Sequence, residues 1–194
     1  MKELFGGGNV EQELIKRIKL GDRKAFADLY NLYADYALRL ALTITKEMAD
    51  AADAVQETFI RVYKNINTFD LQKNFKPWFY RILINECNRI LKKKNKVVLL
   101  DNYFEQKESS VSSQKDNYDF EESERLYNAL CQLNEEIRIP LTLKYLIGFS
   151  GKEIAEILGI NLNTVKSRLY KGRQKLKKFL NQNEEKEGEE WITS

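Results

Sequence analysis

The chain of 194 residues has no histidine and only two cysteines. Without histidine, imidazole general bases, Ser-His or Cys-His nucleophile pairs and most zinc sites are unavailable. Cys87 and Cys131 lie far apart in apolar helical contexts, which favours two buried small side chains over a disulfide or a thiolate metal site. The sequence therefore predicts a protein that is not an enzyme and that holds no metal or cofactor.

Long apolar runs are missing too. Nothing approaches the roughly 20 apolar residues that span a membrane, and the first residues, MKELFGGGNVEQ, lack the apolar core of a signal peptide. A glycine-rich phosphate loop, internal repeats and strand-rich segments are also absent. We therefore expect a cytoplasmic protein without stable membrane insertion.

Charge is present, but it is distributed unevenly. The formal net charge of +3 averages blocks of opposite sign. Residues 161–180 carry only basic charged side chains, whereas residues 101–124 and the tail from residue 181 are mostly acidic. Such segregation suggests that particular faces bind a polyanion.

Apolar residues follow helical spacing almost everywhere, so the predicted fold class is all-α. Four helices are expected in the first half: one ending at Gly21, one capped by Asp22, a third over residues 47–66 and a fourth from about Pro77 to residue 94. The third helix is expected to bury Ala52, Val55, Phe59 and Val62. The apolar face of the first helix is expected to consist of Val10, Leu14, Ile15 and Ile18.

Composition divides the chain into two small helical domains. Residues 101–123 are acidic, serine-rich and without apolar periodicity, which is typical of a flexible linker. We expect an N-terminal helical domain at 1–96, a linker at 97–121, a C-terminal helical domain at 122–182 and an acidic tail at 183–194. Pro140 lies within an expected helix of the second domain, which must start just before it or kink there.

The segment EILGINLNTVKSRLYKGRQKL indicates a helix-turn-helix. Ser150 and Glu153 have capping-box spacing at the start of the first helix, Gly159 suits the turn, and Val165 can anchor the second helix. The exposed face of that second helix mixes amides, a hydroxyl and cations, which are the groups that read base edges and phosphates. The residues expected to bind duplex DNA are Asn163, Thr164, Lys166, Ser167, Arg168, Tyr170, Lys171 and Arg173.

A second polar surface is expected on the fourth helix. Arg81, Asn85, Asn88 and Lys92 recur at helical spacing and form one stripe on an otherwise apolar helix. The preceding loop supplies amides and aromatic rings suited to unpaired bases. Each of its rings could equally well pack in the core.

The segments DAVQETFIRVYKNINTFD (53–70), FKPWFYRILINECNRILKKK (75–94) and FSGKEIAEILGINLNTVKSRLYKGRQKL (149–176) together resemble the extracytoplasmic-function group of bacterial sigma factors. The resemblance implies a non-enzymatic subunit that binds core RNA polymerase, directs it to promoter DNA and helps open the duplex. It also implies an anti-sigma factor as partner. Many relatives carry Asp where this chain has Arg89, so their minus-ten preference does not transfer.

The resemblance assigns roles to particular residues. It implies that the third helix contacts polymerase, the fourth helix and its loop melt the minus-ten element, and the helix-turn-helix reads the minus-thirty-five element. The expected polymerase contacts are Asp53, Gln56, Glu57 and Ile60. The expected minus-ten contacts are Asn67, Phe69, Lys76, Trp78, Arg81, Asn85, Asn88, Arg89 and Lys92.

Two other functions remain open at this point. A stand-alone helix-turn-helix regulator would share the second domain but would bind its operator without polymerase. A metal-dependent nuclease could use Asp50, Asp53 and Glu57, which share a helical face, although no further ligand or nucleophile converges on them.

Overall fold

The structure, a computed structural model, describes the backbone of residues 8–100 and 126–190 and the side chains of residues 10–94 and 126–179. Every regular element in these residues is a helix, which confirms the all-α class. The described residues belong to two compact units, one on each side of residues 101–125. Most of the expected linker lies outside the described residues, and the three boundaries between the four expected segments stay predictions.

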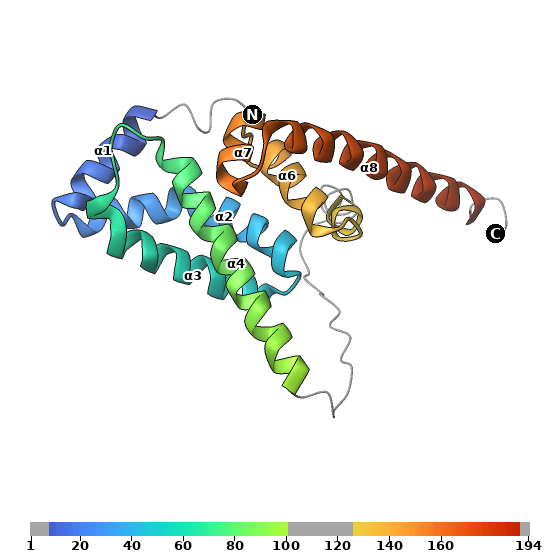
Figure 1. Ribbon diagram of the computed structural model, residues 1–194, viewed down its shortest axis with the longest axis horizontal. Coiled ribbons are helices and arrows are strands. Elements are labelled where there is room, and N and C mark those ends of the chain that lie inside the picture. The colour runs from blue at the N-terminus through green and yellow to red at the C-terminus, as the bar shows by residue number, and fades with distance from the viewer. Residues whose placement is uncertain (1–7, 101–125, 191–194) are drawn as a thin grey trace. The chain divides into compact units, whose positions relative to one another are not determined.

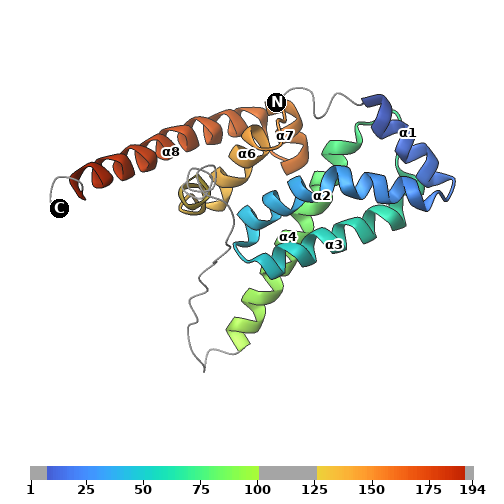
Figure 2. The same cartoon turned by 180° about the vertical axis from the view of Figure 1, so that it is seen from behind.

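The N-terminal unit contains α1 (Gly8–Lys19), α2 (Arg23–Thr45), α3 (Met48–Asn65), the short 3-10 helix η1 (Ile66–Thr68) and α4 (Phe75–Leu100). Figures 1 and 2 show α2 and α3 side by side, with α4 crossing both and α1 folded back at one end of α2. α4 runs beyond residue 94, where the sequence predicted its end. In its first half, the ring of Phe79 packs against both Tyr33 of α2 and Phe59 of α3.

The turn between α1 and α2 is built as the sequence predicts. Gly21 takes a left-handed conformation with φ +88°, which glycine adopts without strain. The Asp22 carboxylate accepts hydrogen bonds from the backbone N–H groups of Lys24 (2.9 Å) and Ala25 (3.1 Å). The hydrogen bond from the Ala25 N–H is the main cause that lowers the pKa of Asp22, and the hydrogen bond from the Arg17 side chain is the next largest. Asp22 is thus the N-cap of α2.

Aromatic rings fill the core of this unit. Tyr33 of α2 lies against Phe79 of α4, with ring centroids 4.7 Å apart, and its hydroxyl donates to Glu11 of α1. Burial is the main cause that raises the pKa of Glu11. The single ring of Tyr33 therefore connects three helices.

Two expected core positions are wrong. Val10 is exposed, and Ala52 is exposed while its neighbour Ala51 is buried. α3 buries Ala51, Val55 and Val62, which keep i, i+4 and i+11 spacing. Ala51 and Ala52 both fit the apolar periodicity, and only the packing of α2 and α4 selects between them.

The C-terminal unit contains a helical segment at 126–131, then α6 (Glu135–Tyr145), α7 (Gly151–Leu158) and α8 (Leu162–Glu190). α6 and α7 pack against the first half of the long helix α8 (Figure 1). α6 begins five residues before Pro140 and continues through it, so Pro140 does not mark the start of the helix.

α6 and α8 approach closely at Gly172. A Cβ atom there would lie 2.5 Å from Leu141 Cδ1 and 2.7 Å from Ile137 Cγ2, both on α6. Real Cβ contacts essentially never come so close, so any side chain at this position forces the two helices or their side chains to move.

We expect Gly172→Ala to lower the free energy of unfolding of the C-terminal unit by about 1–3 kcal/mol, because overpacking outweighs the gain in helix propensity. Gln174→Ala, at an exposed position on the same helix, is the control and should change little. Urea denaturation followed by circular dichroism measures both variants. An unchanged or higher midpoint for Gly172→Ala would contradict the close packing.

Candidate functional site

α7, its turn and the start of α8 form the helix-turn-helix. Ser150 Oγ accepts from the Glu153 N–H (3.3 Å), and the Glu153 carboxylate accepts from the Ser150 N–H (2.8 Å), so the capping box is present. Gly159 ends α7 with φ +65°. The Asn161 side chain then accepts from the Asn163 N–H (2.8 Å), and Val165 is completely buried. Each of these local expectations is confirmed.

The basic face of α8 is exposed, with two exceptions among the expected DNA contacts. Thr164 is half-buried, and Arg168 is turned toward α6, where its NH2 lies 3.1 Å from Glu136 Oε2. Arg173 is exposed and donates to the Tyr145 hydroxyl at 3.4 Å. The remaining expected contacts form one exposed surface: Asn163, Lys166, Ser167, Tyr170 and Lys171.

The polar stripe on α4 also forms. Arg81, Asn85 and Lys92 are exposed, and Asn88 is half-buried. Two of the other expected minus-ten contacts, Lys76 and Trp78, are half-buried at the start of the helix. The stripe therefore presents amides and cations on one side of a helix whose other sides are packed.

Phe69, expected to contact bases, belongs to the core instead. It is only 6% exposed, and its ring centroid lies 4.9 Å from that of Trp78 and 5.6 Å from that of Phe75. The ring has no exposed face on which a base could stack. Burial against the start of α4, which the loop sequence alone does not reveal, explains the error.

α1 holds the loop that carries Asn67 and Phe69. The Lys19 ammonium donates to the backbone carbonyl of Phe69 at 2.6 Å and to that of Asn67 at 3.2 Å. Asn67 itself is exposed. The loop is thus fixed by a side chain almost 50 residues away, a contact that sequence reasoning missed.

The outer side of α2 and α3 contains a groove of about 1160 Å³. Two of the expected polymerase contacts, Gln56 and Ile60, line it, whereas Asp53 and Glu57 do not. Aromatic rings form much of its wall, with the centroids of Tyr30 and Phe59 4.6 Å apart. Tyr30 and Tyr63 remain 45% and 53% exposed. Sequence periodicity gave no sign of the groove.

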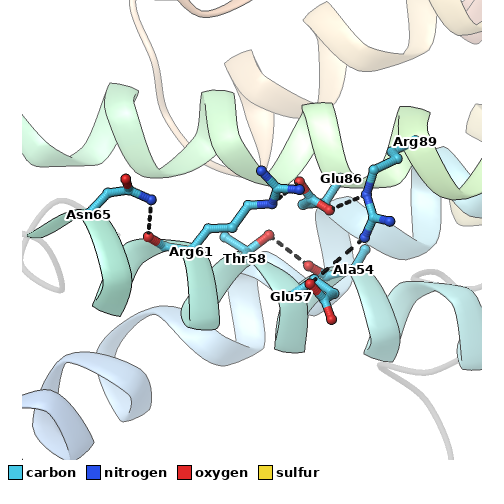
Figure 3. A network of polar contacts seen from close by, with 7 residues as sticks. All are labelled: Ala54, Glu57, Thr58, Arg61, Asn65, Glu86 and Arg89. Carbon is cyan, nitrogen blue, oxygen red and sulfur yellow. Dashed lines mark hydrogen bonds and ion pairs between the residues drawn. The ribbon is translucent and has the colours of Figure 1, made fainter.

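Arg89 pairs with two carboxylates, one of them on another helix. Its Nε lies 2.7 Å from Glu86 Oε2, and its NH2 lies 3.8 Å from Glu57 Oε2 on α3 (Figure 3). Glu86 Oε1 is also bound by Arg61 Nε of α3 at 2.5 Å. Arg89 therefore points toward α3, while its side chain stays 50% exposed, and its assignment as a DNA contact stays a prediction.

The three carboxylates considered for a metal site do not converge. Asp50 is buried and paired with Lys94, whose Nζ lies 2.6 Å from Asp50 Oδ2. Within the described parts of the chain, no three His, Cys, Asp or Glu side chains gather in a set that could hold a metal ion. The described helices also include none with the length and apolar character needed to cross a membrane.

Comparison with known proteins identifies the family. The model for sigma-70 region 2 matches residues 29–97, and the model for sigma-70 region 4 matches residues 123–176. The sequence is 35% identical over 176 residues to the ECF RNA polymerase sigma factor SigW of Bacillus subtilis, covering 86% of this chain and 94% of that protein. The chain belongs to the extracytoplasmic-function sigma factors. As such it is an initiation factor that binds core RNA polymerase and directs it to promoters, and the stand-alone regulator is not favoured.

Other similarities agree with this family. The sigma factor is 30% identical over 177 residues to the ECF RNA polymerase sigma-E factor of Haemophilus influenzae, covering 84% of this chain and 92% of that one. Its fold is similar to that of the sigma factor RpoE from Bartonella quintana, solved in complex with the anti-sigma factor NepR. That similarity has a TM-score of 0.71 and 24% identity, covering 81% of this chain and 98% of that one. α1 lies outside both matched regions.

Lys19→Met removes the two hydrogen bonds to the loop carbonyls while keeping the aliphatic stem, and we expect faster backbone hydrogen exchange over residues 66–74. Hydrogen-exchange mass spectrometry measures this directly. Lys16→Met, at an exposed position on the same helix, should leave the loop unchanged. Equal exchange in both variants would show that Lys19 does not hold the loop.

Proposed function

We propose that this sigma factor uses three separate surfaces during initiation. The groove of α2 and α3, lined by Gln56 and Ile60, binds core polymerase together with Asp53 and Glu57 of α3. The α4 stripe and the loop before it bind the melted minus-ten element. The exposed face of α8 binds the minus-thirty-five duplex. Bond-forming chemistry stays with the polymerase, and the protein acts in the cytoplasm.

The groove is the observation that carries the polymerase assignment. Its apolar wall and exposed tyrosines resemble a protein-binding surface more than ordinary surface, because aromatic residues are enriched at the cores of interfaces. Gln56 and Ile60 were assigned to polymerase by family resemblance alone, and they line this same groove. Its rim carries charges of both signs, Arg23, Asp35 and Lys64.

The two DNA surfaces have different chemistry, which supports different DNA targets. The α8 surface is rich in cations around amides and a hydroxyl, as duplex readers are. The α4 stripe combines two cations, Arg81 and Lys92, with two amides, Asn85 and Asn88, which can hydrogen-bond the edges of bases that have left the duplex. Contacts of this kind can offset the few kcal/mol that unstacking a base costs.

An anti-sigma factor completes the proposal. The structures of RpoE and CnrH, which share the fold at TM-scores of 0.71 and 0.68 and at 24% and 22% identity, were each solved in a complex, RpoE with the anti-sigma factor NepR and CnrH with the cytosolic domain of CnrY. We infer that such a protein also binds this chain. Occupation of the α2 and α3 groove would then block polymerase directly.

Ile60→Asp tests the polymerase surface. A charge in the apolar groove has to be desolvated on binding, so affinity for core polymerase should fall by about tenfold or more. Fluorescence anisotropy of labelled protein with core polymerase gives this value. Val10→Asp, which places the same charge at an exposed apolar position on α1, is the matched control. Equal affinities in the two variants would place the polymerase site elsewhere.

The isolated protein should bind promoter duplex weakly and without strong sequence preference, since its DNA surfaces act together only on polymerase. Electrophoretic mobility shifts with and without core polymerase test this at one stated salt concentration, because phosphate contacts make the affinity salt-dependent. Tight, sequence-specific binding by the isolated protein would support a stand-alone regulator instead.

A further inference from the structure

Glu86 is a buried carboxylate to which the proposed function assigns no role. The residue is 3% exposed, and it lies between α3 and α4. Its two oxygens are bound by two different arginines, Arg61 from α3 at 2.5 Å and Arg89 from α4 at 2.7 Å (Figure 3). A buried charge is strongly unfavourable unless it is paired, so the buried Glu86 carboxylate depends on these two contacts, while Arg61 and Arg89 stay 49% and 50% exposed.

Arg89 extends the connection to a second point on α3. Besides binding Glu86, it approaches Glu57, which precedes Arg61 by one helical turn. α4 is therefore linked to α3 through Glu86–Arg61 and through Arg89–Glu57. A rotation of α4 about its own axis would break both links together, so the pair of contacts fixes that rotation.

The two linked helices carry the polymerase and minus-ten surfaces. On α3, Gln56 and Ile60 line the groove. On α4, the amide Asn85 directly precedes Glu86, and the amide Asn88 follows it by two residues. Helical neighbours differ by about 100° in direction, so the inward position of Glu86 determines where the two amides point. Their direction relative to polymerase-bound α3 thus depends on the contacts of Glu86.

We propose that Glu86 is a positioning residue for promoter opening. With Arg61 and Arg89 it fixes α4 against α3, so that polymerase bound to the groove presents the α4 stripe to the minus-ten DNA in one orientation. Arg89 acts through Glu86 and does not contact DNA. The proposal rests on the function proposed above.

Glu86→Gln keeps the shape of the side chain and removes its charge. In holoenzyme made from the full chain and core polymerase, we expect affinity for polymerase within about twofold of wild type. The rate of promoter opening should fall by about fivefold to tenfold, the size of coupling found between residues in contact. Opening is followed by 2-aminopurine fluorescence in the minus-ten element, at a temperature where circular dichroism shows both proteins folded.

Two further variants accompany it. Glu13→Gln, at an exposed carboxylate on α1, should open the promoter like wild type. Arg61→Met removes the contact between Glu86 and α3, while Glu86 stays paired with Arg89. This variant therefore keeps the test valid if Glu86→Gln does not fold. Like Glu86→Gln, it should leave the affinity for polymerase within about twofold of wild type and slow promoter opening, here by about twofold to fivefold.

A double-variant comparison separates positioning from direct DNA contact by Arg89. If Arg89 acts through Glu86, Arg89→Gln combined with Glu86→Gln should open the promoter no more slowly than the slower single variant. Losses that multiply would mean that Arg89 acts independently of Glu86 and would overturn the proposal. A wild-type opening rate for Glu86→Gln, or an equal loss of polymerase affinity, would also overturn it. If wild-type protein shows no polymerase-dependent opening, the proposed function fails instead.

Discussion

The N-terminal unit depends on how α4 fits against its neighbours. Its rings must pack with Tyr33 of α2, while Glu86 must stay paired with Arg61 of α3. The aromatic packing buries apolar area, but apolar contacts have little directional preference. The charged contacts are directional, and removing one partner from a buried pair is strongly destabilising. Together they leave a single orientation in which the polar stripe of α4 faces solvent.

Local signals in the sequence predicted much of this fold because they depend on neighbouring residues alone. Asp22, Ser150 with Glu153, and Gly159 satisfy helix ends within a few residues of themselves, and each is placed as predicted. The helix-turn-helix and the α4 stripe followed from the same kind of reasoning, since helical spacing determines which residues share a face.

The errors concern contacts between distant segments. Phe69 looked like a residue for stacking on bases, but the start of α4 folds over its ring. The pairing of Arg89 with two carboxylates, one of them on another helix, was likewise not indicated by the sequence. The groove requires α2 and α3 to lie side by side, so neither helix alone indicates it. In each case the missing information was the packing partner.

Under the proposed function, this chain reads promoters at two points and does so only on polymerase. Photo-crosslinking tests it most directly, with p-benzoylphenylalanine at position 85 on α4 or at position 170 on α8. With core polymerase, position 85 should crosslink to minus-ten bases and position 170 to minus-thirty-five bases, and without polymerase neither should do so specifically. Crosslinking of position 85 to duplex DNA in the isolated protein, or of both positions to one element, would contradict the account.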